Sequence, residues 1–216
     1  MMKKTYFIIL IAAVALFFSA CSRNTALLGP KREAVSHEEF VIDTGEYPKI
    51  DITADSCSLH VYSWKEKKVK FEATKRVRGM QPEEDLQKAL KNFSISIDHN
   101  EERVKFISDY KKPIKNPADI GLSLNVYLPA KTESIFISID TGKIKFYDDV
   151  NCLLKAEIGM ANLEINRFEG VIDCSMDMGD VRINSGELKA GSRIRTNMGN
   201  INVKAKVFIP GEYLFR

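Results

Sequence analysis

Apolar and polar residues alternate with a period of two along much of this chain, which is the pattern of strands that bury one face. In the first half, the alternating stretches lie at about 50–61, 69–73, 93–97, 104–106 and 122–128. The stretches 93–97 and 104–106 are separated by the turn residues His99 and Asn100, so together they predict a hairpin. The first half is therefore expected to be rich in strands.

One segment of the first half has a helical pattern instead. Residues 82–91 open with a proline, continue with three acidic residues and end with lysines. Leu86, Ala89 and Leu90 fall on one face at helical spacing. These features are start, dipole and packing signals of an α-helix, so one short helix is predicted here.

The second half contains a repeat that is anchored on four glycines at nearly constant intervals, namely Gly142, Gly159, Gly179 and Gly199. When the four windows are aligned on these glycines, apolar residues occupy 21 of the 24 positions that lie seven, five, three and one before glycine and two and four after it. The alternation slips by one residue at each glycine, so the next strand faces the same interior only if the chain bends there.

Repeats of about twenty residues cannot bury an apolar face alone, and stacking them gives a continuous core. The predicted fold is mainly β: a β-solenoid, or β-helix-like stack, with one winding per repeat over about 132–205 and one short helix in the N-terminal half. Leu163, Ile183 and Val203 are expected to form one interior column. A sandwich of short hairpins is the alternative.

The N-terminus has the organisation of an export signal. Lys3 and Lys4 precede an almost wholly apolar segment, 6–20, which at about 1.5 Å per residue is short for a bilayer span. The small residues Ser19 and Ala20 before Cys21 resemble the cleavage motif of bacterial lipoproteins. That resemblance implies cleavage before Cys21, a lipid on its thiol, and anchoring in a membrane through acyl chains.

The sequence is therefore divided into a lipoprotein signal peptide (1–20), the lipidated cysteine with a tether (21–39), and a β domain (40–216). The tether is assigned from mixed charge, a Gly-Pro pair and the absence of a sustained period. A plain secretory peptide and an uncleaved anchor are the alternatives for 1–20. In the lipoprotein interpretation, the protein is extracytoplasmic and held on a bacterial membrane.

The stretch 50–77, the helix, the strand 124–129 and the repeated glycine-x-apolar-x-apolar units resemble the bacterial family of putative adhesins, over about residues 40–205. The tripeptide 179–181 fits the family's Gly-Asp-Ile/Val pattern, those at 142–144 and 199–201 nearly fit, and that at 159–161 departs from it. The resemblance implies a surface or membrane-associated protein of repetitive β architecture, with no catalytic residues to carry over.

Composition and motifs narrow the function further. The net charge of +3 lacks the basic excess of a nucleic-acid binder, so no nucleic-acid partner is expected. The nucleophile elbow, the phosphate-binding loop and the zinc-protease motif do not occur in the sequence, and neither an enzyme nor a cofactor is expected. The outward row in the repeat is evenly polar, which is typical of a solvated face; it comprises Lys143, Lys145, Asn162, Glu164, Arg182, Asn184, Asn202 and Lys204.

Two further candidate sites come from the repeat and the cysteines. Asp177 and Asp180 flank a repeat glycine, and a column of such oxygen donors is a weak candidate for Ca²⁺, although Asp is also favoured in turns for local reasons. Cys57, Cys152 and Cys174 remain after lipidation of Cys21 and are interpreted mainly as small buried hydrophobes.

Three functions remain open. The first is a non-catalytic, lipid-anchored module that presents a rigid face to an envelope protein or a glycan. The second is an envelope-stress sensor or accessory subunit of a membrane complex. The third is a carbohydrate-active enzyme built on a solenoid, which requires two carboxylates in a groove.

Overall fold

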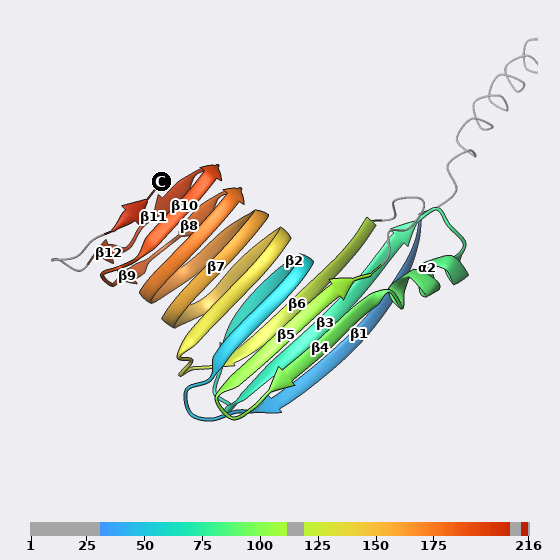
Figure 1. Cartoon of the computed structure of the whole chain (residues 1–216), viewed down its shortest axis with the longest axis horizontal. Helices are drawn as coiled ribbons and strands as arrows, with labels where there is room; N and C mark the ends of the chain where they lie inside the picture. Colours follow the sequence, from blue (N-terminus) through green and yellow to red (C-terminus); the bar gives the residue numbers. More distant parts are fainter. Residues whose placement is uncertain (1–30, 112–118, 208–212, 216) are drawn as a thin grey trace, which may run out of the picture.

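The computed structural model describes residues 31–111, 119–207 and 213–215, and these residues are mainly β with one short helix (Figure 1). This part of the prediction is confirmed. All thirteen strands found among these residues belong to one hydrogen-bonded sheet network. The elements in chain order are β1 (Arg32–Asp43), β2 (Lys49–Trp64), β3 (Lys68–Gly79), α2 (Glu83–Leu90), β4 (Phe93–His99), β5 (Arg103–Tyr110), β6 (Asp119–Pro129), β7 (Ser134–Met178), β8 (Val181–Ile183), β9 (Gly186–Leu188), β10 (Arg193–Met198), β11 (Ile201–Val203), β12 (Lys206–Val207) and β13 (Leu214–Phe215).

The second half of the chain turns round in successive windings that lie side by side (Figure 1). β2 runs parallel to the first winding of β7, from Lys49 against Ser134 to Val61 against Phe146. Further along, Val181 pairs in parallel with Leu163 of the winding before it, and Ile201 of the winding after it pairs in parallel with Val181. The chain therefore returns to the same place in the sheet once per winding.

Alternate residues of these windings fill a common interior because parallel strands in register place equivalent side chains on the same face. The buried set includes Ile135, Ile137, Ile139, Ile144, Phe146, Leu154, Ala156, Leu163, Ile165, Ile172, Cys174, Val181 and Ile183. Most apolar positions of the repeat thus form the core, as their alternation predicts, whereas Met178 and Met198 are exposed.

The alignment of the repeat on Gly159 is wrong by two residues. A Cβ placed on Gly179 would overlap the carbonyl oxygen of Ala161, so Ala161 and not Gly159 is the neighbour of Gly179 in the preceding winding. Gly159 is also absent from the glycines with positive φ, which include Gly142, Gly179 and Gly199. Windings of unequal length cause this shift, and an even shift leaves the inward parity unchanged.

The shift also changes the interior columns. Ile183 pairs with Ile165 in the preceding winding and with Val203 in the following one. Leu163 belongs to the neighbouring column, against Val181. The prediction that Leu163, Ile183 and Val203 form one column is therefore wrong for Leu163, whose place is taken by Ile165.

Each winding has three straight segments, of which the sequence repeat indicates two. The third segment pairs Phe168–Gly170 with β9, and Phe168 and Leu188 from this side are fully buried. The stretch from Arg167 to Gly170 carries no clear alternation, because it is too short to show a period.

The corner that follows the first segment is wider than a single glycine. Met178 and Met198, which stand immediately before Gly179 and Gly199, are exposed although the alternation places them inside. Their neighbours Asp177 and Asp180 are exposed as well. The alternation therefore ends before the glycine, because the chain is already turning there.

β2 connects the windings to two further groups of N-terminal strands. Lys49–Ala54 of β2 pair with β5, whereas Cys57–Trp64 pair with β6. β5 carries the antiparallel strand β4, which confirms the predicted hairpin, and β6 leads through β3 to β1 by antiparallel pairing. The rings of Phe71 on β3 and Phe106 on β5 stack at 5.1 Å, so the two groups meet through their side chains.

α2 lies against β1 and β3 at the end of the molecule that is remote from β11 (Figure 1). Leu86, Ala89 and Leu90 are its buried residues, and its first turn is acidic. The helix and its apolar face are as predicted.

The predicted tether is wrong for its last part, because β1 begins at Arg32. β1 pairs with β3 from Arg32 against Gly79 to Asp43 against Lys68. The sequence hides the period of two, since the inward positions include the polar Glu38. That carboxylate is paired with the ammonium of Lys75, which is itself buried, at 2.5 Å.

The predicted signal peptide, Cys21 and the first part of the tether lie outside the described residues. Within the residues that the structure does describe, no helix combines the length and the apolar content needed to cross a bilayer.

Candidate binding surface

The outer side of the sheet formed by β6, β2 and β7 carries a row of tyrosines. Tyr62 pairs in register with Tyr127 of β6, and their rings stack at 5.2 Å. On its other side, the ring of Tyr62 stacks on that of Tyr147 at 4.8 Å with an interplanar angle of 8°. We call Tyr62, Tyr127 and Tyr147 the aromatic row.

The row exists because three strands bring the same short pattern into register. An apolar inward residue precedes each tyrosine, namely Val61, Val126 and Phe146. β2 pairs in parallel with both β6 and β7, so these three inward residues align and the tyrosines that follow them point outward together. Cross-strand aromatic pairs stabilise a sheet by up to about 1 kcal/mol, and offset rings at these distances are favourable.

Both ends of the row are covered by a lysine. The ammonium of Lys70 lies 5.4 Å from the ring centroid of Tyr127, and that of Lys145 lies 5.0 Å from the centroid of Tyr147. Both are cation–π distances. Trp64 lies beside Tyr127 with its ring centroid 5.7 Å away, and its indole N–H donates to the carbonyl oxygen of Lys68 at 2.7 Å.

The lysine charges at the row are compensated by carboxylates. Lys70 forms ion pairs with Glu72 at 2.7 Å and with Glu39 at 3.2 Å, and Lys145 pairs with Glu164 at 3.2 Å. The hydrogen bond from Lys70 is the largest cause that holds the pKa of Glu72 below its usual range, so this carboxylate is ionised at neutral pH.

The hydroxyls of Tyr127 and Tyr147 lie within hydrogen-bonding distance of neighbouring side chains. The Tyr127 hydroxyl donates to Glu72 at 3.1 Å, and burial is the main reason that its pKa is raised. Nδ1 of His60 lies 3.1 Å from the Tyr147 hydroxyl. Burial first, and then Lys143 and Lys145, lower the pKa of His60, which is therefore uncharged at pH 7.

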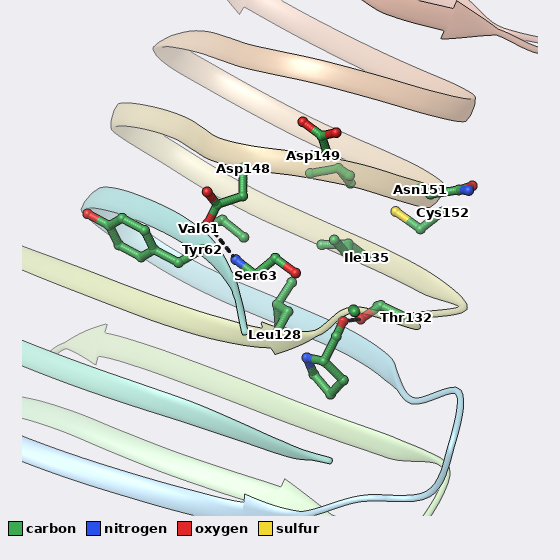
Figure 2. Close-up of a pocket in the computed structure, with 13 residues that line it drawn as sticks. Val61, Tyr62, Ser63, Leu128, Thr132, Ile135, Asp148, Asp149, Asn151 and Cys152 are labelled. Carbon is green, nitrogen blue, oxygen red and sulfur yellow. Dashed lines mark hydrogen bonds between the residues drawn. The ribbon is translucent and has the colours of Figure 1, made fainter. Parts of the chain in front are cut away.

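A small cavity lies near the ends of β2 and β6, beside residues 148–152 of β7 (Figure 2). Its volume of about 20 Å³ suits a single water molecule. The Asp148 carboxylate at its rim accepts a hydrogen bond from the backbone N–H of Ser63 at 2.9 Å, whereas the ring of Tyr62 points away from the cavity (Figure 2). A cavity of this size cannot hold an organic ligand. The groups of this region that a larger ligand could contact are therefore those of the aromatic row on the outer face of the sheet.

Asp177 and Asp180, the candidate calcium ligands, form hydrogen bonds with residues of the next winding. Asp177 accepts a hydrogen bond from the Asn197 amide at 3.1 Å, and Asp180 accepts from the backbone N–H of Asn200 at 2.8 Å and from its side chain at 3.0 Å. The two carboxylates therefore connect adjacent windings. Over the described ranges, no group of three or more His, Cys, Asp and Glu side chains is arranged to hold a metal ion.

Cys57, Cys152 and Cys174 are free and buried. Burial raises the pKa of each thiol to about 12, so all three remain protonated at neutral pH. Since the thiolate is the reactive form, these positions behave as small apolar core residues.

The polar row from Lys143 to Lys204, which the sequence assigns to a solvated face, does point outward. The aromatic row beside it is not predicted from the sequence. Tyr62, Tyr127 and Tyr147 are far apart along the chain, so only the register of three strands brings them together. The recurring pair of an apolar residue followed by tyrosine is the available clue.

Chains similar to this one occur among solved structures of bacterial proteins. A putative cell adhesion protein from Clostridium sporogenes is 11% identical with a TM-score of 0.46, covering 85% of this chain and 100% of the other. A putative adhesin from Parabacteroides distasonis is 12% identical with a TM-score of 0.36, covering 85% and 97%. A third, a putative adhesin from Bacteroides fragilis, is 9% identical with a TM-score of 0.29, covering 84% and 96%.

Neither the models of known protein families nor the curated proteins contain a match to this chain. The solved neighbours are thus adhesin-like by name and remote in sequence. At these TM-scores and identities, the likeness assigns no activity.

Proposed function

We propose that this protein is a non-enzymatic, lipid-anchored binding module of the bacterial cell envelope. Its body is a β-solenoid that holds the aromatic row rigid and accessible to a surface glycan or envelope protein. The observation that carries the proposal is the row itself. Tyrosine supplies a large contact area with few rotatable bonds, and it adds a hydroxyl that can hydrogen-bond, which is why it is enriched at binding surfaces.

Rigidity supports this role. Tyr62 stands on β2, which is paired along both edges, with β6 on one side and β7 on the other. Val61, the residue before it, is buried in the core. A ligand would therefore meet side chains that are already ordered, so that little conformational entropy is lost on binding.

Compensated charge indicates the chemistry of the partner. Lys70 and Lys145 are each in ion pairs, and the lowered pKa of His60 leaves it neutral at pH 7. The row thus offers apolar ring surface and hydroxyls between two lysines whose charges are compensated, and Lys143 near His60 is a further exposed positive charge. This combination suits a neutral ligand with both apolar and hydroxyl groups, and binding is expected to depend weakly on ionic strength.

Replacing Tyr62 and Tyr147 by serine should weaken binding of the displayed protein to its partner about tenfold or more, because central aromatic anchors contribute over about 1 kcal/mol each. The measurement is the attachment of cells that carry the protein to immobilised envelope glycans and envelope proteins. Phe136→Ser is the matched control, since it removes an aromatic ring from another outward face, where Lys155 covers it at 5.4 Å.

The proposal of a binding module is wrong if the double variant, folded and displayed at wild-type level, attaches as well as the wild type. It is also wrong if Phe136→Ser reduces attachment equally. Equal loss from both variants would report a general effect of lost aromatic surface.

Anchoring has a separate test. Cys21→Ser should move the protein from the membrane fraction to the soluble extracytoplasmic fraction or leave an uncleaved precursor, because the thiol that carries the acyl chains is gone. The measurement is fractionation with immunodetection, and Cys57→Ser, which alters a buried thiol, is the control. Unchanged fractionation and unchanged size of Cys21→Ser would contradict the anchor.

A further inference from the structure

Three methionines form a column on one corner of the stack. Met178 and Met198 are register partners on adjacent windings. In the winding before, Gly179 lies against Ala161 and Val181 pairs with Leu163, and this common register places Met160 beside Met178. We call Met160, Met178 and Met198 the methionine column.

All three side chains are open to solvent. Met160 is 56% exposed, Met178 42% and Met198 59%. An isolated exposed methionine is ordinary, as Met80 at 53% illustrates. The three methionines of the column differ from such an isolated residue because they occupy the same corner position on consecutive windings. Their side chains therefore project from neighbouring strands about 4.8 Å apart, close enough to contact one ligand.

Polar contacts on both flanks of the column hold the corner in place. Asn162 accepts from the backbone N–H of Asp180 at 2.9 Å, and Asp180 in turn accepts from Asn200. On the other flank, Asp177 accepts from Asn197. The backbone positions of the methionines are thereby fixed while the side chains retain three rotatable bonds each.

We propose that the methionine column is a binding site for a soft monovalent cation, Cu(I), with the three thioether sulfurs as ligands. Thioethers select soft ions such as Cu(I) over the hard cations that prefer oxygen. Long unbranched side chains from adjacent strands can converge on one ion without moving the backbone. The flanking carboxylates Asp177 and Asp180 raise the local concentration of cations electrostatically.

The binding step is coordination alone: each sulfur donates a lone pair, no bond of the protein is broken and no electron is transferred. The column lies at the corner before Gly179 and Gly199, and the aromatic row lies further along the next segment of the windings. Metal binding at the column is therefore independent of the binding function proposed for the row.

The test uses the purified full-length protein carrying methionine labelled with ¹³C at the methyl group. Ag(I), a redox-inert ion of the same softness, serves as the first probe and Cu(I) under reducing anaerobic conditions as the second. One equivalent of either ion should shift the methyl resonances of Met160, Met178 and Met198 together. Met80, exposed but solitary, and Met176, buried in the core, should not shift.

Variants separate the column from other soft ligands. Met178→Leu should lower the affinity for Ag(I) and Cu(I) at least tenfold, whereas Met80→Leu should leave it unchanged. The variant with leucine at all three column positions keeps every cysteine, every histidine and the other methionines, so any ion that it still binds is held by those ligands and not by the column. Leucine has nearly the same volume as methionine, and thermal unfolding should confirm that each variant is folded.

The proposal is overturned if the first equivalent of ion leaves the three methyl groups unshifted, or if it shifts Met80 to the same extent. It is overturned equally if the triple leucine variant binds the ion as tightly as the wild type. Ag(I) binding without Cu(I) binding would also refute the assignment to Cu(I).

Discussion

Ile183→Asp is expected to abolish the cooperative unfolding transition of the domain. Ile183 has no solvent exposure and lies between Ile165 and Val203 of the neighbouring windings. An aspartate at this position would be a buried carboxylate without a partner, which costs several kcal/mol, a large share of the stability of an ordinary domain. The measurement is thermal unfolding followed by circular dichroism.

Asn184→Asp provides the matched control for this prediction. It adds the same negative charge one residue later, at an exposed outward position of the same winding. Its stability should remain within about 0.5 kcal/mol of wild type. A wild-type melting temperature for Ile183→Asp would mean that Ile183 does not face the interior, and the stacking of windings would then be wrong.

The interior is predictable because period-two alternation depends only on local sequence. Ile137 and Ile144 lie on opposite sides of Gly142 and have opposite parity, and the bend at that glycine turns both inward. The misalignment at Gly159 does not disturb this result, since a shift of two residues preserves parity. Which residue is the neighbour of which in the next winding is set by the length of each winding, and this length is not encoded in alternation.

The parts that escape prediction depend on pairing between distant segments. β1 has the sequence pattern of a tether because Glu38 occupies an inward position, and the buried Lys75 that compensates it lies on another strand. The aromatic row likewise requires the register of β2 with both β6 and β7. Sequence distance hides such contacts, whereas local periodicity does not.

The methionine column is a case in which local alternation itself gives the wrong orientation. Alternation assigns Met178 and Met198 to the interior because their parity matches that of Met176, which is buried. Parity applies only while a strand continues in its plane, and these two residues already belong to the corner. An apolar residue next to a predicted bend therefore has no orientation that alternation alone can assign.

Gly179→Ala is expected to destabilise the domain by about 3 kcal/mol or more, because two costs add at this corner. The φ of Gly179 is +136°, a conformation that residues with a Cβ rarely adopt. The added Cβ would also overlap the carbonyl oxygen of Ala161, an atom of the backbone in the preceding winding. The windings must separate locally to relieve this overlap, which breaks their hydrogen bonds.

Gly121→Ala is the matched control, because no atom lies within 4 Å of its added Cβ and Gly121 is not among the glycines with positive φ. This variant should be neutral or stabilised by up to about 1 kcal/mol through a more restricted unfolded chain. Chemical denaturation of both variants gives the comparison. Equal stability of Gly179→Ala and Gly121→Ala would show that the windings do not approach each other closely at this corner, and the close stacking that positions both the core and the methionine column would have to be abandoned.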